Sequence, residues 1–325
     1  ISTIINFMLI CTVWIIMVFL TALKDYKSVT LAFFLGLFLA FIASLFIAPK
    51  YGVVGMISGF NIGIALIITI LLARILIEYP YRIKKPFEYV KYFRKYWELA
   101  LVGLFYNMAA WVDKWVMWFA PEGEIMPSGL ILYPNYDGAM FLAYLTIVPS
   151  MALFVFSIET NFFEKYVEFY KLIQTNTTFR KIQQRHHAMV KTIIESARNF
   201  LILQLAISVI CILLAARIFD FLQINYLQIG IFRYGVLGAL FHVMTIFLTI
   251  MLSYFDNRWA ILKIQCLFLV TNASLTYYIM DWGFEFYGYG YFLSSLVSFI
   301  YAAFIFAQYI NKLPYHAFVT SNSSI

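Results

Sequence analysis

The stretch that decides the fold is residues 29–73. It reads VTLAFFLGLFLAFIASLFIA at 29–48, PKYG at 49–52 and VVGMISGFNIGIALIITILLA at 53–73, and Lys50 is its only charged residue. A helix needs about 20 apolar residues to cross the hydrocarbon core of a bilayer. Every backbone amide must be paired within the segment there, because no water is available. The stretch therefore predicts two membrane-spanning helices joined by a tight turn.

The composition of the whole chain indicates the same environment. Of its 325 residues, 63% are apolar and 12% are charged, whereas soluble domains carry about 25% charged residues. A soluble enzyme, a DNA-binding domain and a disordered chain are therefore excluded. The apolar runs are continuous and lack the alternation of a transmembrane barrel. The predicted fold class is an all-α polytopic integral membrane protein.

Nine stretches are long and apolar enough to span a bilayer. We expect transmembrane helices at residues 1–22, 29–48, 53–73, 99–120, 137–159, 199–218, 231–253, 259–281 and 290–311.

The distribution of positive charge orients these spans. When the connections alternate between two sides, one side receives 18 of the 23 Lys and Arg residues and the other receives three. The richer side consists of residues 22–28, 74–98, 160–198, 254–258 and the tail from 312. The positive-inside rule places it in the cytoplasm. Topology thus explains the net charge of +7, and no nucleic-acid partner is expected.

Two short turns suggest an internal repeat. PKYGVVG at 49–55 precedes the third span and EFYGYG at 285–290 precedes the ninth, six spans later. Each is an extracytoplasmic Tyr-Gly turn with a second glycine entering the next helix. The chain also opens on Ile1 inside an apolar run, without the basic region of a signal peptide. We expect nine helices present of twelve, in two six-helix lobes, with the first three helices missing from this piece.

This plan divides the chain into four parts. They are the last three helices of the N-terminal lobe (1–73), a cytoplasmic amphipathic linker (74–98), the C-terminal six-helix lobe (99–311) and a cytoplasmic tail (312–325). The linker sequence PFEYVKYFRKYW at 86–97 separates aromatic from charged residues at helical spacing, which is typical of a helix in the membrane interface. Segment 160–198 is expected to form a cytoplasmic helical hairpin that either docks a partner or is simply solvated.

The fourth span carries the densest set of candidate functional residues. Helical spacing places Trp111, Lys114, Trp115 and Trp118 on one face, while Asp113 points away, so we expect that Asp113 and Lys114 do not pair with each other. Indoles around a cation suit a sugar, whose ring faces stack on aromatic side chains. The alternative is an interfacial tryptophan belt with a lysine that snorkels outward.

The fifth span begins at Tyr136-Asp137 and ends at Glu159. At 1.5 Å per residue the two carboxylates lie about 33 Å apart, one at each mouth of the span. Such acids would attract a cationic solute, although carboxylates are also ordinary at membrane interfaces. Pro149 removes a backbone hydrogen bond between them and predicts a kink or hinge.

Enzymatic chemistry has no support in the sequence. Hydrolase, metalloprotease, P-loop and dinucleotide-binding motifs are absent. The three cysteines lie in apolar runs without a paired cysteine or histidine. We therefore expect no enzyme, no catalytic residues, no cofactor and no metal. His242 lies in the middle of a span and is either a proton relay or a hydrogen-bonded core histidine.

Several runs resemble one known family. DKWVMWF at 113–119, YDGAMFLAYLTIVP at 136–149 and Glu159-Thr160 resemble the PelG family, the Pel exopolysaccharide transporter. SYFDNR at 253–258 and YGYGY at 287–291 are similar to that family too. The resemblance extends over most of the chain.

The resemblance implies the flippase fold of the multidrug/oligosaccharidyl-lipid/polysaccharide exporter superfamily, with twelve helices in two lobes, in the bacterial inner membrane. It also implies a cytoplasmic glycosyltransferase and membrane partners, including a cyclic-di-GMP receptor. Together they would move an exopolysaccharide chain to the periplasm, one that is rich in N-acetylgalactosamine, partly deacetylated and hence cationic. The resemblance brings no established site residues.

Three functions stay open at this point. The first is a polysaccharide translocator in which the indoles stack on sugars and Asp113, Asp137 and Glu159 attract a positive chain. The second is an ion-coupled small-molecule antiporter on the same scaffold, with Asp113 or His242 as the titrating group. The third is a non-transporting membrane scaffold that recruits the polymer synthase.

Overall fold

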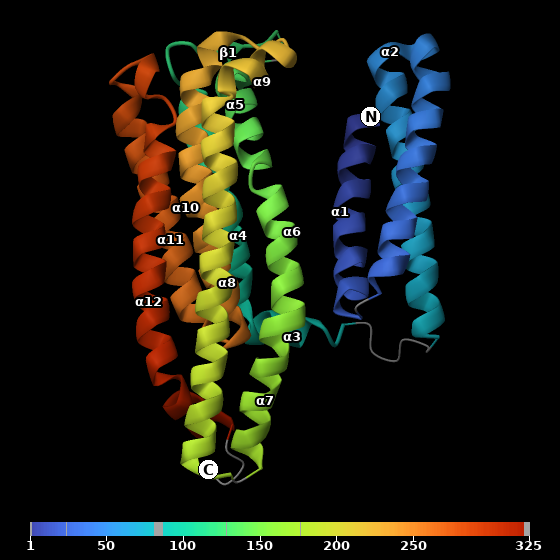
Figure 1. The fold of residues 1–325 in the computed structure, drawn as a ribbon. Helices are drawn as coiled ribbons and strands as arrows, with labels where there is room; N and C mark the ends of the chain where they lie inside the picture. The colour runs from blue at the N-terminus through green and yellow to red at the C-terminus, as the bar shows by residue number, and fades with distance from the viewer. Residues whose placement is uncertain (1, 24, 81–86, 128, 176, 322–325) are drawn as a thin grey trace. The chain divides into compact units, whose positions relative to one another are not determined.

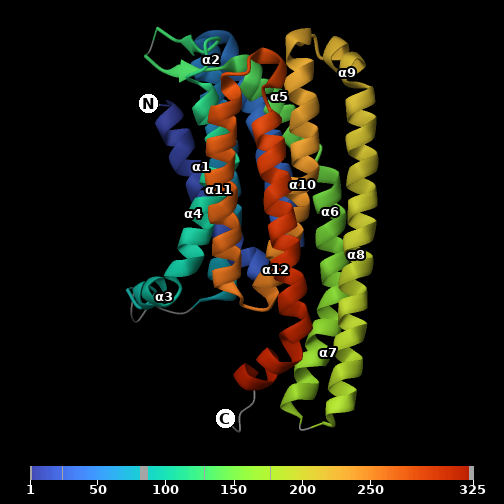
Figure 2. The same cartoon turned by 90° about the vertical axis from the view of Figure 1, so that its left-hand side faces the viewer.

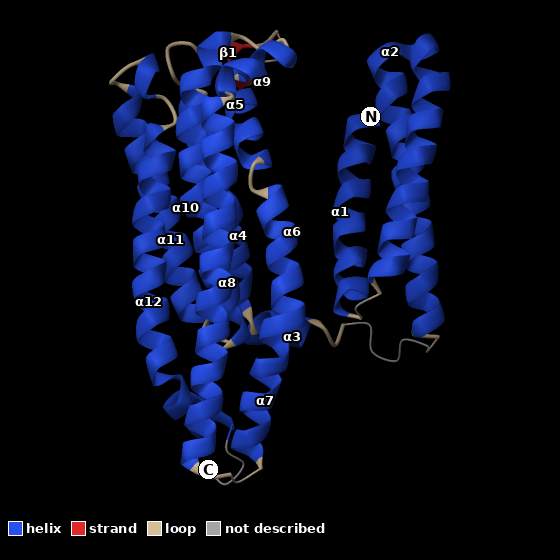
Figure 3. Ribbon diagram, in the orientation of Figure 1, coloured by secondary structure: helices blue, strands red, loops and turns tan. Residues whose placement is uncertain are grey.

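The computed structural model describes residues 2–23, 25–80, 87–127, 129–175 and 177–321, and within these ranges the side chains of residues 22, 159, 160 and 318–321 are not described. Almost all of the described chain is helical (Figure 3). The chain divides into two compact units, residues 1–88 and 89–325, and each is described by itself. The division falls within the segment 74–98 that the sequence predicts as a linker.

The first unit consists of α1 (Ser2–Ala22) and the long helix α2 (Tyr26–Glu78). Helix α2 contains both spans predicted at 29–48 and 53–73, and it doubles back on itself between them (Figure 1). The reversal occurs at Gly52, whose backbone has φ 57° and ψ −137°. A positive φ is easily adopted only by glycine. The predicted turn at PKYG is therefore present.

Small residues let the two limbs of α2 pack closely. A Cβ atom on Gly59 would overlap Ser44, and one on Gly63 would overlap Ala40. Small residues at four-residue spacing on facing helices allow such close backbone contact within a membrane.

At the end of the unit opposite the Gly52 turn, Arg74 donates a hydrogen bond to Asp25 at 2.6 Å, which holds the pKa of that carboxyl below its ordinary value.

The described part of the second unit contains ten α-helices, three short helical turns and a two-stranded sheet. Its elements are α3 (Val90–Lys95), α4 (Trp97–Met117), β1 (Glu124–Ile125), β2 (Ile131–Leu132), α5 (Pro134–Leu145), α6 (Val148–Ser157), the π-helical turn η1 (Ile158–Phe162), α7 (Phe163–Gln174), α8 (Phe179–Leu213), α9 (Ala215–Phe221), η2 (Tyr226–Gln228), α10 (Ile229–Tyr254), α11 (Arg258–Met280), η3 (Phe284–Phe286) and α12 (Tyr289–Ser321). The strands are antiparallel, with Glu124 opposite Leu132 and Ile125 opposite Ile131. The sequence did not predict this small hairpin.

Helix α10 is the centre of the second unit. It packs against α5, α8 and α12 and is buried on most of its surface, as expected for a helix that is apolar on all sides. A Cβ atom on Gly235 would overlap Ala143 of α5, and one on Gly238 would overlap Tyr291 of α12. These two glycines therefore determine how closely α5 and α12 approach α10.

The predicted cytoplasmic segments of the second unit lie at one end of it. Helix α3, the turn between α7 and α8 and the end of α12 lie at the end opposite β1 (Figure 2). Helix α7 and the first part of α8 extend past the level at which α10 turns into α11 (Figure 2).

Seven helical segments of the described chain are long and apolar enough to cross a membrane. One of them is α2, which contains two predicted spans, whereas α4, which carries Asp113 and Lys114, is not among the seven. The span predicted at 137–159 is interrupted between α5 and α6, and the span at 199–218 is interrupted between α8 and α9. The multi-pass helical class is confirmed, and the count of nine stays a prediction.

Glycine packing in α2 is open to a direct test. Gly59→Ala should lower the free energy of unfolding by about 1–3 kcal/mol, because the added methyl group overlaps the backbone of Ser44. Gly103→Ala in α4 is the matched control, since nothing lies within 4 Å of its Cβ position. It should be neutral or stabilising by about 0.5–1 kcal/mol. Thermal unfolding of the purified variants measures both, and equal effects would contradict the packing described for α2.

Candidate functional site

A buried ion pair lies near the C-terminal end of α4. Asp113 is fully buried and Lys114 is 6% exposed. The Lys114 Nζ atom lies 3.3 Å from both carboxylate oxygens of Asp113, and it also donates to the carbonyl oxygen of Ala110 at 3.1 Å. The expectation that these two residues do not pair is therefore wrong. Helical spacing gives the direction in which each side chain leaves the helix, but the long lysine chain bends back across that angle.

Two tyrosines of α5 complete the surroundings of the pair. The hydroxyl of Tyr136 donates to Asp113 Oδ2 at 3.1 Å, and Tyr136 is fully buried. The ammonium of Lys114 lies 4.7 Å from the centre of the Tyr144 ring, within the range of a cation–π contact. Residues eight apart lie on one face of a helix. Helix α5 therefore presents Tyr136 to the carboxylate and Tyr144 to the ammonium.

A buried histidine extends these contacts to α10 and α12. The Nδ1 atom of His242 lies 2.8 Å from the hydroxyl oxygen of Tyr291, and its Nε2 atom has no hydrogen-bond partner in the structure. The imidazole is 5.8 Å from the Tyr144 ring, centre to centre, and the rings of Tyr144 and Tyr291 are 5.5 Å apart. Residues from four helices thus form one contiguous group. We call it the polar cluster: Asp113, Lys114, Tyr136, Tyr144, His242 and Tyr291.

The sequence interpretation missed Tyr144 and Tyr291. The spacing from Tyr136 to Tyr144 was a usable signal, because it places both on one face of the fifth span. Tyr291 directly follows the YGYG motif, but its proximity to His242 depends on the packing of α12 against α10. No local pattern in the sequence contains that information.

The three tryptophans that the sequence predicts on one face of α4 have different surroundings in the structure. Trp118 donates its indole N–H to Asp137 at 3.0 Å from Oδ2, and both side chains are half-buried. Trp111 is 52% exposed, with its ring centre 5.7 Å from Lys114 Nζ. Trp115 is 37% exposed and lines a shallow apolar hollow of about 330 Å³ with Phe119. Trp111 and Trp118 therefore contact the charged groups, and Trp115 does not.

The remaining site predictions lie along α5 and α6. Pro149 is the second residue of α6, directly after the interruption that separates α6 from α5. At this interruption Thr146 Oγ1 donates to the carbonyl of Ala143 at 2.6 Å, and Gln204 of α8 donates to the carbonyl of Thr146 at 3.4 Å. Side chains thus donate to two of the backbone carbonyls at this interruption, where helical pairing is incomplete. The side chain of Glu159 lies outside the described residues.

The chemistry of the site is electrostatic. Asp113 and Lys114 lie within the span predicted at 99–120 and Asp137 within the span predicted at 137–159, and unpaired charges inside a membrane are costly. The hydroxyl of Tyr136 donates to Asp113 and the indole N–H of Trp118 donates to Asp137, so neither acid depends on Lys114 alone. In the described part of the chain, no group of three or more His, Cys, Asp or Glu side chains could hold a metal ion.

Comparison with known proteins agrees with a transport role. The model of the family PelG, described as Putative exopolysaccharide Exporter (EPS-E), matches residues 1–318. No match is found among the curated proteins. The structure is similar to the outward-facing conformation of a multidrug resistance MATE family transporter of the MOP superfamily, with a TM-score of 0.63 and 14% sequence identity.

That similarity covers 87% of this chain and 62% of the transporter, so the chain spans less than two thirds of its structural neighbour. At 14% identity the likeness shows the fold alone. The matched family is described as one of exporters, and the similar solved structure is that of a transporter. With its apolar helices, its transporter fold and a family match over nearly its whole length, this multi-pass membrane protein belongs to the PelG family of exopolysaccharide exporters.

Proposed function

We propose that this protein translocates a cationic, N-acetylgalactosamine-rich exopolysaccharide of the Pel type across the bacterial inner membrane to the periplasm. The observation that carries the proposal is the buried Asp113–Lys114 pair, which contacts Tyr136 and lies within the span predicted at 99–120. Ionisable residues in such positions are rare and usually mark a substrate or ion pathway. Packing alone would be served as well by apolar side chains of similar volume.

The surroundings of Lys114 allow its partner to be exchanged. Its ammonium already contacts the carbonyl of Ala110 and the ring faces of Tyr144 and Trp111. It therefore keeps part of its compensation when it releases Asp113. An amino group of a deacetylated sugar would then take its place at the carboxylate, in a charge-assisted hydrogen bond. Lys114 acts in this scheme as an internal stand-in for the cationic substrate.

The other predicted site residues have supporting roles in the proposal. The exposed faces of Trp111 and Trp115 would stack on sugar rings, and Asp137 would add negative potential near the outer end. Pro149 would serve as the hinge between α5 and α6. Glu159 would act at the cytoplasmic mouth.

The complete exporter would have twelve helices in two six-helix lobes, as the family resemblance implies. Its partners would be a cytoplasmic glycosyltransferase that supplies the polymer and membrane proteins that include a cyclic-di-GMP receptor. The excess of Lys and Arg in 74–98 and 160–198 supports a cytoplasmic location for both segments.

An ion-coupled antiporter of small molecules is the second candidate, and one observation favours it. The Nε2 atom of buried His242 lacks a partner and is joined through Tyr291 and Tyr144 to the ion pair. Proton- or sodium-driven efflux of a small cation from vesicles would favour this function over polymer translocation.

The role of the ion pair can be separated from its contribution to stability. Asp113→Asn leaves Lys114 buried without its counter-charge, which should destabilise the protein by about 3–5 kcal/mol. The double variant Asp113→Asn/Lys114→Met removes both charges and should insert and unfold much like the wild type. We expect it nevertheless to secrete at least about tenfold less polymer. Secreted hexosamine, divided by the amount of protein in the membrane, gives the result.

Asp281→Asn is the matched control, because Asp281 is an exposed carboxylate at the outer end of α11. It should secrete normally. If the double variant of Asp113 and Lys114 also secretes normally, the pair is structural and the site assignment is wrong.

The indoles are tested by keeping or removing an aromatic face. Trp115→Ala should reduce secretion strongly, while Trp115→Phe should retain most of it, since stacking on a sugar ring needs an aromatic surface and not the indole N–H. Phe304→Ala, which removes an exposed aromatic side chain of α12, is the control. Full secretion by Trp115→Ala would show that Trp115 contacts only lipid.

A further inference from the structure

Three helices of the second unit continue beyond the level of the α10–α11 turn. The hydroxyl of Tyr166 donates to the carbonyl of Tyr254 at 3.0 Å, and that of Tyr309 donates to the carbonyl of Phe255 at 3.2 Å. These bonds place Tyr166 and Tyr309 level with the turn. Helix α8 has 35 residues, or about 52 Å at 1.5 Å per residue, whereas the hydrocarbon core is about 30 Å thick. We call the projecting part, residues 167–174, 179–186 and 311–317, the stalk.

The stalk is a packed structure rather than three solvated ends. It continues the main hydrophobic core of the unit with a set of fully or nearly fully buried side chains: Phe169, Ile173, Ile182, Leu313 and Ala317. Arg185 of α8 forms an ion pair with Glu168 of α7 at 3.1 Å. The two limbs of the hairpin are therefore fixed to each other and to α12.

A histidine joins α8 to α12 at the base of the stalk. Pro314 lies inside α12 and has no N–H group, so the carbonyl of Ile310 loses its helical donor. The Nε2 atom of buried His186 lies 2.9 Å from that carbonyl oxygen. His186 therefore donates from Nε2 and replaces the missing backbone donor, which keeps α8 in register with α12.

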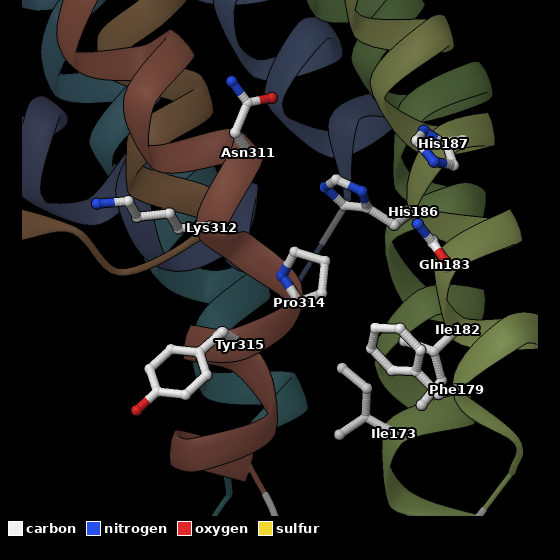
Figure 4. Close-up of a pocket in the computed structure, with 10 residues that line it drawn as sticks. All are labelled: Ile173, Phe179, Ile182, Gln183, His186, His187, Asn311, Lys312, Pro314 and Tyr315. Carbon is white, nitrogen blue, oxygen red and sulfur yellow. The ribbon is translucent and has the colours of Figure 1, made fainter.

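An apolar cavity of about 650 Å³ opens beside this contact. Figure 4 shows Phe179, Ile182 and His186 of α8 facing Pro314 of α12, while Lys312 and Tyr315 extend outward from α12. The complete lining is Ile173, Phe179, Ile182, Gln183, His186, His187, Asn311, Lys312, Pro314 and Tyr315. None of these ten residues is a carboxylate, and three of them, His186, His187 and Lys312, are bases.

We propose that this cavity binds the apolar face of an acidic amphipathic helix from a cytoplasmic protein. Two large aromatic side chains border it and are strongly exposed, Phe179 at 70% and Tyr315 at 71%. Exposed apolar surface outside the membrane usually marks an interaction site. A groove between helices accepts apolar side chains at helical spacing. This inference does not depend on which substrate the protein exports.

The positive charge around the cavity indicates that its partner is acidic. Segment 160–198, which supplies α7 and the first part of α8, contains seven Lys and Arg residues and three Asp and Glu residues. Lys312 adds a further positive charge at the rim of the cavity. A helix with carboxylates flanking its apolar face would be attracted to this rim, and a basic helix would be repelled.

The depth of the cavity argues against a lipid chain as its occupant. Pro314 and Tyr315 lie five and six residues beyond Tyr309, or about 8–9 Å along the helix axis on the water side of the turn. The turn itself carries the charged pair Asp256–Arg258, which requires an aqueous or interfacial environment. Acyl chains extend from the headgroups in the opposite direction, into the core.

Photocrosslinking in living cells tests the proposal. A benzophenone amino acid at position 179 replaces one exposed aromatic side chain with another, and the same group at Val167 of α7, exposed but outside the lining, is the control. We expect position 179 to give a protein adduct that peptide mapping assigns to an acidic amphipathic helix, with little adduct at 167. Lys312→Glu should lower the yield about tenfold, as expected for the loss of one interfacial charge contact of about 1.4 kcal/mol.

Lys191→Glu is the matched charge reversal, because Lys191 is exposed on α8 away from the cavity. It should leave the yield unchanged, and a Glu→Lys exchange in the mapped helix should restore the adduct with Lys312→Glu. Adducts with lipid, equal adducts at positions 179 and 167, a mapped segment that is not an acidic helix, or no adduct at all would each overturn the proposal.

Discussion

A charge inside a bilayer must be compensated by the protein itself, and the second unit is arranged around this constraint. Asp113 and Lys114 compensate each other, but each also has partners that do not depend on the other: the hydroxyl of Tyr136 for the carboxylate, and the carbonyl of Ala110 with the ring of Tyr144 for the ammonium. When such a pair opens, each charge keeps some of its partners, which lowers the cost of opening. That property distinguishes an ion pair that can exchange its partner for a substrate from one that stays permanently paired.

Close helix packing brings these partners together. Gly235 and Gly238 admit α5 and α12 to within backbone contact distance of α10, so that the aromatic side chains of α5 and α12 reach His242. Glycines allow the same close packing between the limbs of α2 in the first unit.

The two Tyr-Gly turns have similar local geometry. Gly52 and Gly288, the first glycines of these turns, both have positive φ, and the next glycine of each motif packs on the preceding helix. The sequence similarity of the turns thus extends to their local geometry.

Apolar runs of about 20 residues predicted the helical, multi-pass class, since that length is set by the bilayer alone. The same runs did not show that the fifth span is broken before Pro149. In the site, residue type identified Asp113, Tyr136 and His242 as candidates. Their contacts with Lys114, Tyr144 and Tyr291 depend on side-chain reach and on helix packing, which spacing along one helix does not contain.

The most direct test of the proposed translocation is to observe polymer crossing a membrane. Vesicles containing the purified protein would be supplied from outside with a synthase that elongates the polymer, and a glycosidase would then be added outside. If the protein translocates the polymer, the polymer becomes resistant to the glycosidase only in vesicles that contain the protein. Complete digestion in those vesicles, or equal protection in vesicles without the protein, would contradict it.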